Sequence, residues 1–527
     1  MELREKILQT FVVTIREINK HGGPEKFFEE YPVGGMYFNA GQMFFDENGL
    51  EVGSATTYER LEECKRHSKS RLLICADAVR MEGQNAFFNA HKSLGASLNL
   101  QDAYNYGKCI GMQINSRGID WVLAPSIDMC FDNLMYLEAI TNDPQAAVEI
   151  YTQVVKGIQD QGVAATIKHF PGLGTYFVNM HIAPGSNTMG FDEWMSTYGY
   201  VYKELIKAGV QSVMTTHVSL KSYDNEFSDG YYPIATYSKK LTTDLLKGEL
   251  GFDGAVVTDA LIMGGMATGD LVAETVQAFK AGADFLLWPP VEAAEAIEKA
   301  ILDGEIPMSR LDDALERINR LKSFRDGALK AKNYDEPDTD FVDKSLEEIA
   351  KHGICLLRND VGILPLKKDE HKKVLIVDVT DDDEVSSELL RAEIEKYGIK
   401  AEVKKDIYDV PSRVCWQSDI DDLQSHYDLV IFNVNAHFVA QWSVAHMLIW
   451  ASHLFDKRKK IIVNYGSPYF AVDYFPEDPT FIEMNCSPSK ETVELLAKGL
   501  FGETEFTGKS ILKQYKTVKS SGIFSLL

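Results

Sequence analysis

The sequence predicts an α/β protein with an N-terminal (β/α)8 TIM-like barrel followed by a C-terminal three-layer α/β sandwich. With 527 residues, the chain is longer than one hydrophobic core usually supports. Short apolar segments alternate with helical patterns over roughly the first 300 residues, which indicates a parallel sheet. Polar residues stand at the carboxyl ends of these segments, where the active site of a closed barrel lies.

Eight segments are the expected barrel strands. They are short, apolar and often β-branched, as strands buried on both faces are. In chain order they are residues 11–15, 34–39, 72–77, 121–128, 162–167, 210–217, 254–259 and 283–288. The first strand is either residues 11–15 or a degenerate segment.

The alternating pattern lapses at a polar stretch near residues 330–338, which is typical of a linker. We therefore expect a catalytic barrel domain at residues 1–333, a linker at 334–345 and a second domain at 346–527. In the second domain, expected strands alternate with helical segments, which indicates an open sheet covered on both faces. These strands are residues 373–378, 428–434 and 460–466.

Composition excludes several classes of function. The chain has 78 acidic and 54 basic residues, a net charge of −24, which argues against a nucleic-acid partner. No stretch reaches the ~18 apolar residues of a membrane span, and the N-terminus lacks a signal-peptide profile. The seven cysteines are scattered and form no CxxC pair, so neither a disulfide framework nor a zinc site is indicated. We expect a cytoplasmic protein with no cofactor and no metal; the oligomeric state stays open.

Two expected strands end in residues that can carry chemistry. The sequence KHFPG at 168–172 follows one strand, with His181 shortly after, and Asp259 ends another. A carboxylate at the end of a buried strand is held rigidly in place. Residues distant in sequence would thus meet at one rim, which predicts an active site.

These segments resemble family 3 glycoside hydrolases of the β-N-acetylglucosaminidase branch. The main matches are KHFPGLG at 168–174 with His181, and VVTDALIMGG at 256–265. Further matches are GG at 34–35, AD at 76–77, APSID at 124–128, FDG at 252–254, LLRND at 356–360, LPL at 364–366, LFG at 500–502 and TGK at 507–509.

The resemblance implies a catalytic pair. Asp259 would be the nucleophile that forms a glycosyl-enzyme ester, since a carboxylate stabilises an oxocarbenium-like transition state and then bonds to it. His181, on the loop after the fifth strand, would be the acid/base, because an imidazole with an ordinary pKa near ~6.5 can give and take a proton at neutral pH.

The resemblance also implies a sugar-binding set. Lys168 and His169 would bind sugar hydroxyls, Asp77 would accept a pair of hydroxyl hydrogen bonds, and Met263 lies in the segment that follows the nucleophile. His217, at the end of the sixth strand, is a further pocket candidate. The alternative is structural: a buried ion pair between strand ends and core histidines with satisfied hydrogen bonds.

The chain departs from the branch in three places. The branch usually has Asp two residues before the catalytic His, whereas this chain has Asn179, so we expect a weaker or more acid-shifted general acid. Residues 132–140 lack the Arg that follows the fourth strand in the family, and residues 77–84 lack the usual Gly-Gly-Arg sequence. Arg80 or Glu82 either compensates or is solvated. The substrate therefore need not be the branch's usual N-acetylglucosaminide.

We interpret the chain as a retaining β-glycosidase of the β-N-acetylhexosaminidase type, acting on a small carbohydrate. One alternative is a glycoside phosphorylase of the same family, because loss of an acidic partner beside His181 lessens repulsion of phosphate. Another is a catalytically impaired relative that binds sugars, since fold alone does not guarantee activity. The Gly-rich segment 264–270 lacks phosphate-binding spacing and indicates a flexible loop.

Overall fold

The computed structural model describes most of the chain. The described residues are 2–38, 54–77, 91–129, 139–174, 179–227, 230, 232–266, 268–329, 338–380, 386–405, 407, 416–436 and 443–512. They form two compact units. Unit 1 comprises Met1–Val79, Ala103–Ala139 and Asp143–Val342, and unit 2 comprises Arg80–Asp102, Ile140–Asn142 and Asp343–Leu527. The predicted division at a 334–345 linker stays a prediction, because residues 330–337 lie outside the described part.

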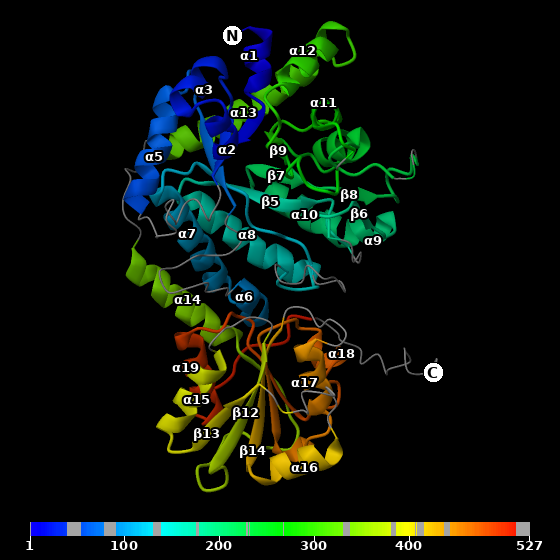
Figure 1. Cartoon of the computed structure of the whole chain (residues 1–527). Coiled ribbons are helices and arrows are strands. Elements are labelled where there is room, and N and C mark those ends of the chain that lie inside the picture. The colour runs from blue at the N-terminus through cyan, green and yellow to red at the C-terminus, as the bar shows by residue number, and fades with distance from the viewer. Residues whose placement is uncertain are drawn as a thin grey trace. The chain divides into compact units, whose positions relative to one another are not determined.

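Unit 1 is built on eight parallel strands (Figure 1). They are β1 (Phe11–Thr14), β2 (Gly35–Phe38), β3 (Leu73–Ala76), β4 (Trp121–Val122), β5 (Ala164–Phe170), β7 (Ser212–Thr215), β9 (Ala255–Thr258) and β10 (Leu286–Leu287). Their order is β10-β1-β2-β3-β4-β5-β7-β9, and a bridge between Val257 and Phe285 joins the two ends. Each segment expected from the sequence overlaps one of these strands, so the predicted barrel is confirmed.

The barrel interior is filled by apolar side chains that alternate strands direct inward. Trp121 and Phe285 pack there with ring centroids 4.9 Å apart. Helix α13 (Met308–Leu329) adds Ile318 and Leu321 to the same core. This core fills the interior of the barrel, so chemistry is left to the rim at the carboxyl ends of the strands.

The other elements of unit 1 are helices and a small sheet. The helices are α1 (Leu3–Leu8), α2 (Ile15–Lys20), α3 (Pro24–Glu30), α5 (Ser54–His67), α7 (Leu100–Ser116), α8 (Pro144–Asp160), α9 (Phe191–Ser196), α10 (Tyr198–Lys207), a π-helix (Lys240–Glu249), α11 (Leu271–Ala281) and α12 (Ala293–Leu302). Strands β6 (Gly185–Asn187) and β8 (Val218–Leu220) pair with each other outside the barrel. No helix in the described part of the chain is long and apolar enough to cross a membrane.

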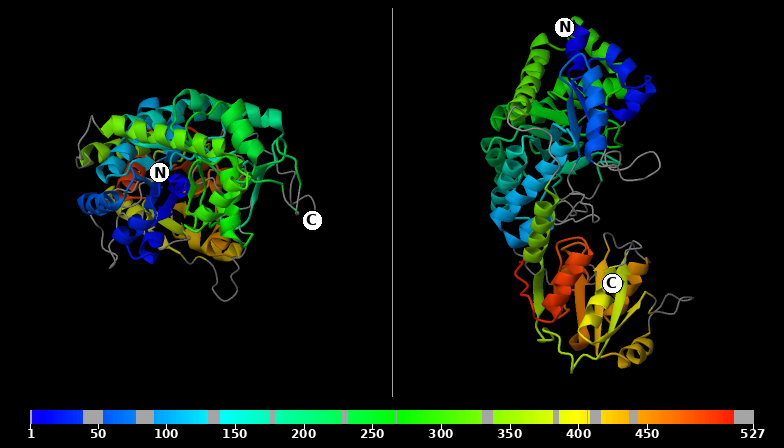
Figure 2. Two further views of the ribbon diagram at one scale, coloured as in Figure 1. Left: turned by 90° about the horizontal axis from the view of Figure 1, so that it is seen from above. Right: turned by 90° about the vertical axis from the view of Figure 1, so that its left-hand side faces the viewer.

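Unit 2 contains a six-stranded sheet of order β11-β16-β15-β14-β12-β13. Its strands are β11 (Cys355–Asn359), β12 (Lys373–Thr380), β13 (Lys400–Lys404), β14 (Leu429–Asn435), β15 (Lys460–Asn464) and β16 (Thr480–Glu483), and its helices are α6 (His91–Ser97), α14 (Thr339–Gly353), α15 (Ser386–Lys396), α16 (Gln417–Ser425), α17 (Val444–Ser452), α18 (Phe470–Asp473) and α19 (Lys490–Leu500). Only β11 is antiparallel to its neighbour. Helices cover both faces, with α15 and α19 on one side and α16 and α17 on the other (Figures 1 and 2). The predicted α/β sandwich is therefore confirmed.

Candidate active site

A cavity of about 350 Å³ opens at the carboxyl ends of the barrel strands. Its walls are Tyr37, Asp77, Leu123, Lys168, His169, Met180, His181, Met214, Asp259, Ala260, Ile262, Met263, Leu287 and Trp288. Six of the eight residues predicted as site residues are among them. The other two, Asn179 and His217, make contacts with the residues of the wall or their neighbours.

Asp259 follows β9 directly and is 6% exposed. Its Oδ1 accepts a hydrogen bond from the Ala260 N–H at 2.8 Å, and its Oδ2 accepts one from the Thr216 hydroxyl at 2.9 Å. Burial opposes ionisation, but the charges of His169, His217 and Lys168 outweigh it and hold the pKa of Asp259 below its usual range. The carboxylate is therefore ionised, oriented and next to the cavity.

His169 is held by the carboxylate of Asp128. The His169 Nδ1–H donates to Asp128 Oδ2 at 2.7 Å, and the Leu173 N–H donates to Asp128 Oδ1 at 3.0 Å. Burial would lower the pKa of His169, but the hydrogen bond and charge of Asp128 raise it above the usual value. Asp128 thus fixes both the ring and the turn that follows β5.

Lys168 and Asp77 form an ion pair across the mouth of the barrel. The Lys168 ammonium lies 3.0 Å from Asp77 Oδ1 and 3.1 Å from Oδ2. The lysine side chain is buried, whereas the Asp77 side chain is 41% exposed. The ion pair between strand ends, which was the alternative to sugar binding, is therefore present. Asp77 is also exposed enough to accept a hydrogen bond from a bound hydroxyl.

His181 lies on the exposed loop after β5 and is oriented by Asn179. The Asn179 Oδ1 accepts from the His181 Nδ1–H at 2.7 Å and from the His181 backbone N–H at 3.0 Å. Because the amide oxygen can only accept, it fixes the tautomer with a proton on Nδ1. The other nitrogen, Nε2, is then the one that exchanges a proton.

Two glycines tie the His181 loop to the loop that follows β9. The Gly264 N–H donates to the His181 carbonyl at 2.9 Å, and the Gly265 N–H donates to the Met180 carbonyl at 3.1 Å. A Cβ added at Gly265 would lie 2.4 Å from the Met180 oxygen, and one at Gly264 would lie 2.4 Å from the Ile182 oxygen. Only glycine permits this approach. The Gly-rich segment, expected as a flexible loop, thus has a specific contact here.

His217 is buried behind Asp259 and does not line the cavity. Its Nε2–H donates to the Ala260 carbonyl at 3.1 Å, and its Nδ1 accepts from the Thr236 hydroxyl at 2.9 Å. Burial lowers its pKa, and the nearby carboxylate of Asp259 acts in the opposite direction. In this structure His217 supports the backbone beside the nucleophile, and its predicted contact with sugar stays a prediction.

Several residues of the site were not predicted from the sequence. They include the wall residues Tyr37 and Trp288, and Thr216, which donates to Asp259. Tyr37 and Trp288 stand at or near the ends of β2 and β10, and their rings meet edge to face with centroids 5.1 Å apart. The rule that selected Asp77 and Asp259, a strand end facing the rim, could also have selected Trp288. The segments 78–84 and 132–138, with Arg80 and Glu82, lie outside the described residues.

Comparisons with known proteins show which family the sequence matches. The model of the glycosyl hydrolase family 3 N-terminal domain matches residues 2–321. A β-N-acetylglucosaminidase/β-glucosidase from Cellulomonas fimi is 28% identical over 434 residues, 76% of this chain and 75% of that protein. A β-hexosaminidase A from Pseudoalteromonas piscicida is 28% identical over 395 residues, 67% of this chain and 64% of that protein.

Two solved structures share the fold over nearly the whole chain. A β-glucoside phosphorylase, BglX, has a TM-score of 0.82 at 22% identity and covers 98% of this chain and 94% of its own. A family 3 β-N-acetylglucosaminidase from Paenibacillus sp. str. FPU-7 has a TM-score of 0.79 at 23% identity, covering 97% and 99%. At these identities the likeness concerns the fold alone.

Proposed function

This chain belongs to glycoside hydrolase family 3, and from that membership we propose that it is a retaining β-glycosidase that removes terminal β-linked N-acetylhexosamine by double displacement. The chain is a glycoside hydrolase; the sugar, the stereochemistry and the residue roles are the proposal. One observation carries it: Asp259 and His181 line the same cavity, and hydrogen bonds from Gly264 and Gly265 hold their loops together.

In the first step, Asp259 attacks the anomeric carbon of the sugar. The bond from that carbon to the leaving oxygen breaks as the ester to Asp259 forms, and His181 Nε2–H gives its proton to the leaving oxygen. Before this transfer the ring carries a proton on both nitrogens and is positive, and its Nδ1–H donates to the neutral amide oxygen of Asn179. After the transfer the ring is neutral and can act as a base.

In the second step, His181 takes a proton from water, and the water oxygen attacks the anomeric carbon. The ester bond breaks, Asp259 is released as a carboxylate, and the sugar leaves with its original configuration. Thr216 and the Ala260 N–H then stabilise the regenerated carboxylate.

Sugar binding in this proposal falls to Asp77, Lys168 and His169. The exposed carboxylate of Asp77 can accept two sugar hydroxyls, and Lys168 and His169 can donate to others. The printed names of the Cellulomonas and Pseudoalteromonas relatives support an N-acetylhexosamine as the sugar. A reducing, cytoplasmic location is also proposed, supported by five described cysteines that are buried and unpaired.

The test is a panel of 4-nitrophenyl β-glycosides, with the first-formed anomer followed by NMR. The proposal expects turnover of the N-acetyl-β-glucosaminide, the β-anomer as first product, and no turnover by Asp259→Asn. An α-anomer as first product would contradict the retaining mechanism. Sugar binding without turnover across the panel would favour the impaired relative instead.

A glycoside phosphorylase is the second candidate, and Asn179 is the observation that favours it. The residue bonded to His181 carries no negative charge, so a phosphate anion that resolves the ester meets less repulsion at this point. Measuring free sugar against sugar 1-phosphate, with and without inorganic phosphate, separates the two activities. Phosphate-independent release of free sugar excludes the phosphorylase.

A further inference from the structure

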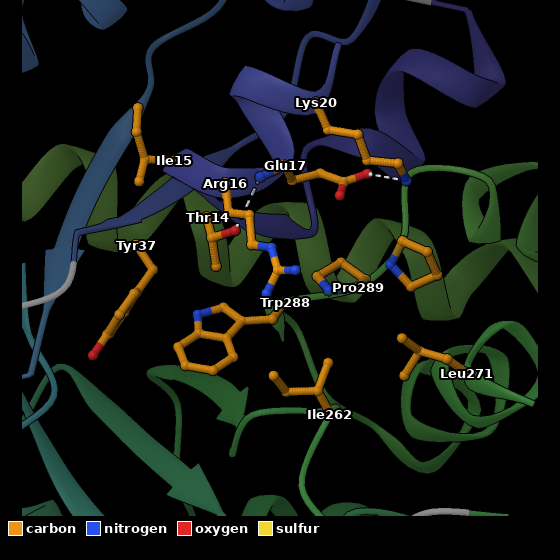
Figure 3. A pocket seen from close by; sticks show the side chains of 11 residues that line it. Thr14, Ile15, Arg16, Glu17, Lys20, Tyr37, Ile262, Leu271, Trp288 and Pro289 are labelled. Atoms are coloured by element: carbon orange, nitrogen blue, oxygen red, sulfur yellow. Dashed lines mark hydrogen bonds and ion pairs between the residues drawn. The ribbon is translucent and has the colours of Figure 1, made fainter. Parts of the chain in front are cut away.

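A second, larger cavity of about 640 Å³ adjoins the catalytic one (Figure 3). It is lined by Thr14, Ile15, Arg16, Glu17, Lys20, Tyr37, Ile262, Leu271, Trp288, Pro289 and Pro290. Tyr37, Ile262 and Trp288 line both cavities. A molecule bound next to Asp259 can therefore extend past these three side chains into the larger cavity, whose volume is typical of small-molecule sites.

Trp288 forms the shared wall and offers a face suited to a sugar ring. Its backbone has φ of 64°, an unusual conformation for a bulky residue, and its N–H donates to the Val12 carbonyl at 2.9 Å. The indole Nε1–H is buried, and no described residue accepts its hydrogen bond. The indole ring lines both cavities and can supply apolar contact to a bound sugar.

The same cavity carries a positive charge that no described residue balances. Figure 3 shows the Arg16 guanidinium directed between Trp288 and Pro289. Arg16 is exposed and forms no hydrogen bond or ion pair with the described residues. Glu17, the one acidic residue among the described lining, is bonded elsewhere, with Oε1 3.6 Å from Lys20 Nζ and 3.3 Å from His21 Nε2.

An unbalanced arginine in this place points to an anionic ligand. The whole chain has a net charge of −24, so a cavity whose walls carry Arg16 and Lys20 against Glu17 alone differs in sign from the bulk of the protein. Guanidinium groups bind carboxylates and phosphates through two parallel hydrogen bonds.

We propose that this cavity binds the leaving group of the substrate, and that the leaving group is a sugar carrying a carboxylate or phosphate that Arg16 binds. This inference rests on the proposed function, because it treats Asp259 as the nucleophile for the adjoining sugar. The ring of the leaving sugar lies on Trp288, and its anionic substituent reaches the guanidinium.

The experiment compares three β-linked disaccharides with the same non-reducing sugar, whose reducing-end sugars are glucose, glucuronate and glucose 6-phosphate. For the native protein we expect kcat/KM for at least one anionic leaving group to exceed that for glucose by about tenfold or more. A preference for the glucuronate disaccharide identifies a carboxylate as the bound group, and a preference for the glucose 6-phosphate disaccharide identifies a phosphate. Arg16→Gln should abolish the preference, by lowering kcat/KM for the anionic disaccharide about tenfold more than for the glucose disaccharide.

Arg66→Gln is the matched control, since Arg66 is an exposed arginine that lines neither cavity. It should keep the native preference. Equal kcat/KM for all three disaccharides in the native protein, or an undiminished preference in Arg16→Gln, would overturn the proposal.

Failure of the proposed function is distinguishable from failure of this inference. If no glycoside is turned over, NMR titration with methyl β-glucuronide, glucose 6-phosphate and methyl β-glucoside still tests the cavity. Binding of an anionic sugar that Arg16→Gln weakens about tenfold supports the site. Equal binding by the native protein and Arg16→Gln contradicts it.

Discussion

At Asp259, burial and neighbouring charges act on ionisation in opposite directions. Burial would protonate the carboxyl, whereas His169, His217 and Lys168 favour the carboxylate, and their combined effect lowers the pKa. A nucleophile must be ionised, so activity should hold above this lowered pKa and fall as the pH drops through it. Residues that donate to the carboxylate therefore set the acid limb of the pH profile.

Thr216→Val tests this dependence at the residue scale. The substitution removes the 2.9 Å hydrogen bond to Oδ2, so the pKa of Asp259 rises and the acid limb of kcat/KM moves upward by about half to one pH unit. Thr242→Val is a suitable control, because that buried hydroxyl bonds the Ala235 carbonyl instead. An unmoved limb in an active Thr216→Val protein would show that the contact does not govern ionisation.

Asn179→Asp tests the other catalytic group. An anionic partner 2.7 Å from His181 Nδ1 stabilises the protonated ring, so the alkaline limb should move to higher pH by about one unit. Asn179→Ala should instead lower kcat, because nothing then orients the ring. If pH–rate profiles of Asn179→Asp and the native protein coincide, the loop is not arranged as this hydrogen bond indicates.

At the scale of elements, the barrel fixes Asp259 while a glycine contact fixes His181. Asp259 is placed by β9, which is buried along its whole length. His181 belongs to an exposed loop, and its position depends on the hydrogen bonds that Gly264 and Gly265 make with it. The position of His181 relative to Asp259 therefore depends on the hydrogen bonds between these two loops.

Gly265→Ala should separate these loops. The added methyl would stand 2.4 Å from the Met180 carbonyl, so the loop must shift, and a shift of about 1 Å can cost about a hundredfold in rate. The loss should be large for alkyl glycosides, whose leaving oxygen needs a proton, and small for 2,4-dinitrophenyl glycosides. Gly327→Ala, which has open space around its Cβ, is the control and should behave like the native protein. Equal losses on both substrate types would argue against proton transfer by this loop.

At the scale of the whole molecule, a buried ion pair holds the closed end of the barrel. Arg325 Nε lies 2.9 Å from Asp120 Oδ1, and the guanidinium also donates to the Gly162 carbonyl and the Asn115 side chain. Asp120 is fully buried and also lies 3.2 Å from Arg71 and 3.9 Å from Lys65, so removing Arg325 takes away one of three cations that compensate a buried charge.

Arg325→Met should therefore lower the free energy of unfolding of unit 1 by about 3 kcal/mol while leaving kcat unchanged at 25 °C. Urea unfolding followed by tryptophan fluorescence measures the change. Arg66→Gln, on the exposed face of α5, should have little effect. A stability loss accompanied by an equal loss of kcat would mean that this end of the barrel also shapes the active site.

Sequence patterns predicted the barrel because its strands are apolar runs that end in polar residues. In unit 2 the same reasoning found β12, β14 and β15, which are buried, but missed three strands: the edge strands β11 and β13, whose side chains are partly exposed, and β16, which is buried but only four residues long. The residues placed in the site came from strand ends and from the family motif. Trp288 and Arg16 were not predicted, because an aromatic strand end resembles core and an isolated arginine resembles surface until the fold brings them together.

In the proposed mechanism Asp259 forms the covalent intermediate, and His181 gives a proton to the leaving oxygen of the same glycosidic bond. Trapping with a 2,4-dinitrophenyl 2-deoxy-2-fluoro-β-glycoside, followed by intact-protein and peptide mass spectrometry, tests it most directly. We expect one fluoroglycosyl adduct, on the peptide that contains Asp259. In His181→Ala this adduct should form faster than it is hydrolysed. An adduct on another residue, or burst-free turnover with Asp259 unlabelled, would contradict it.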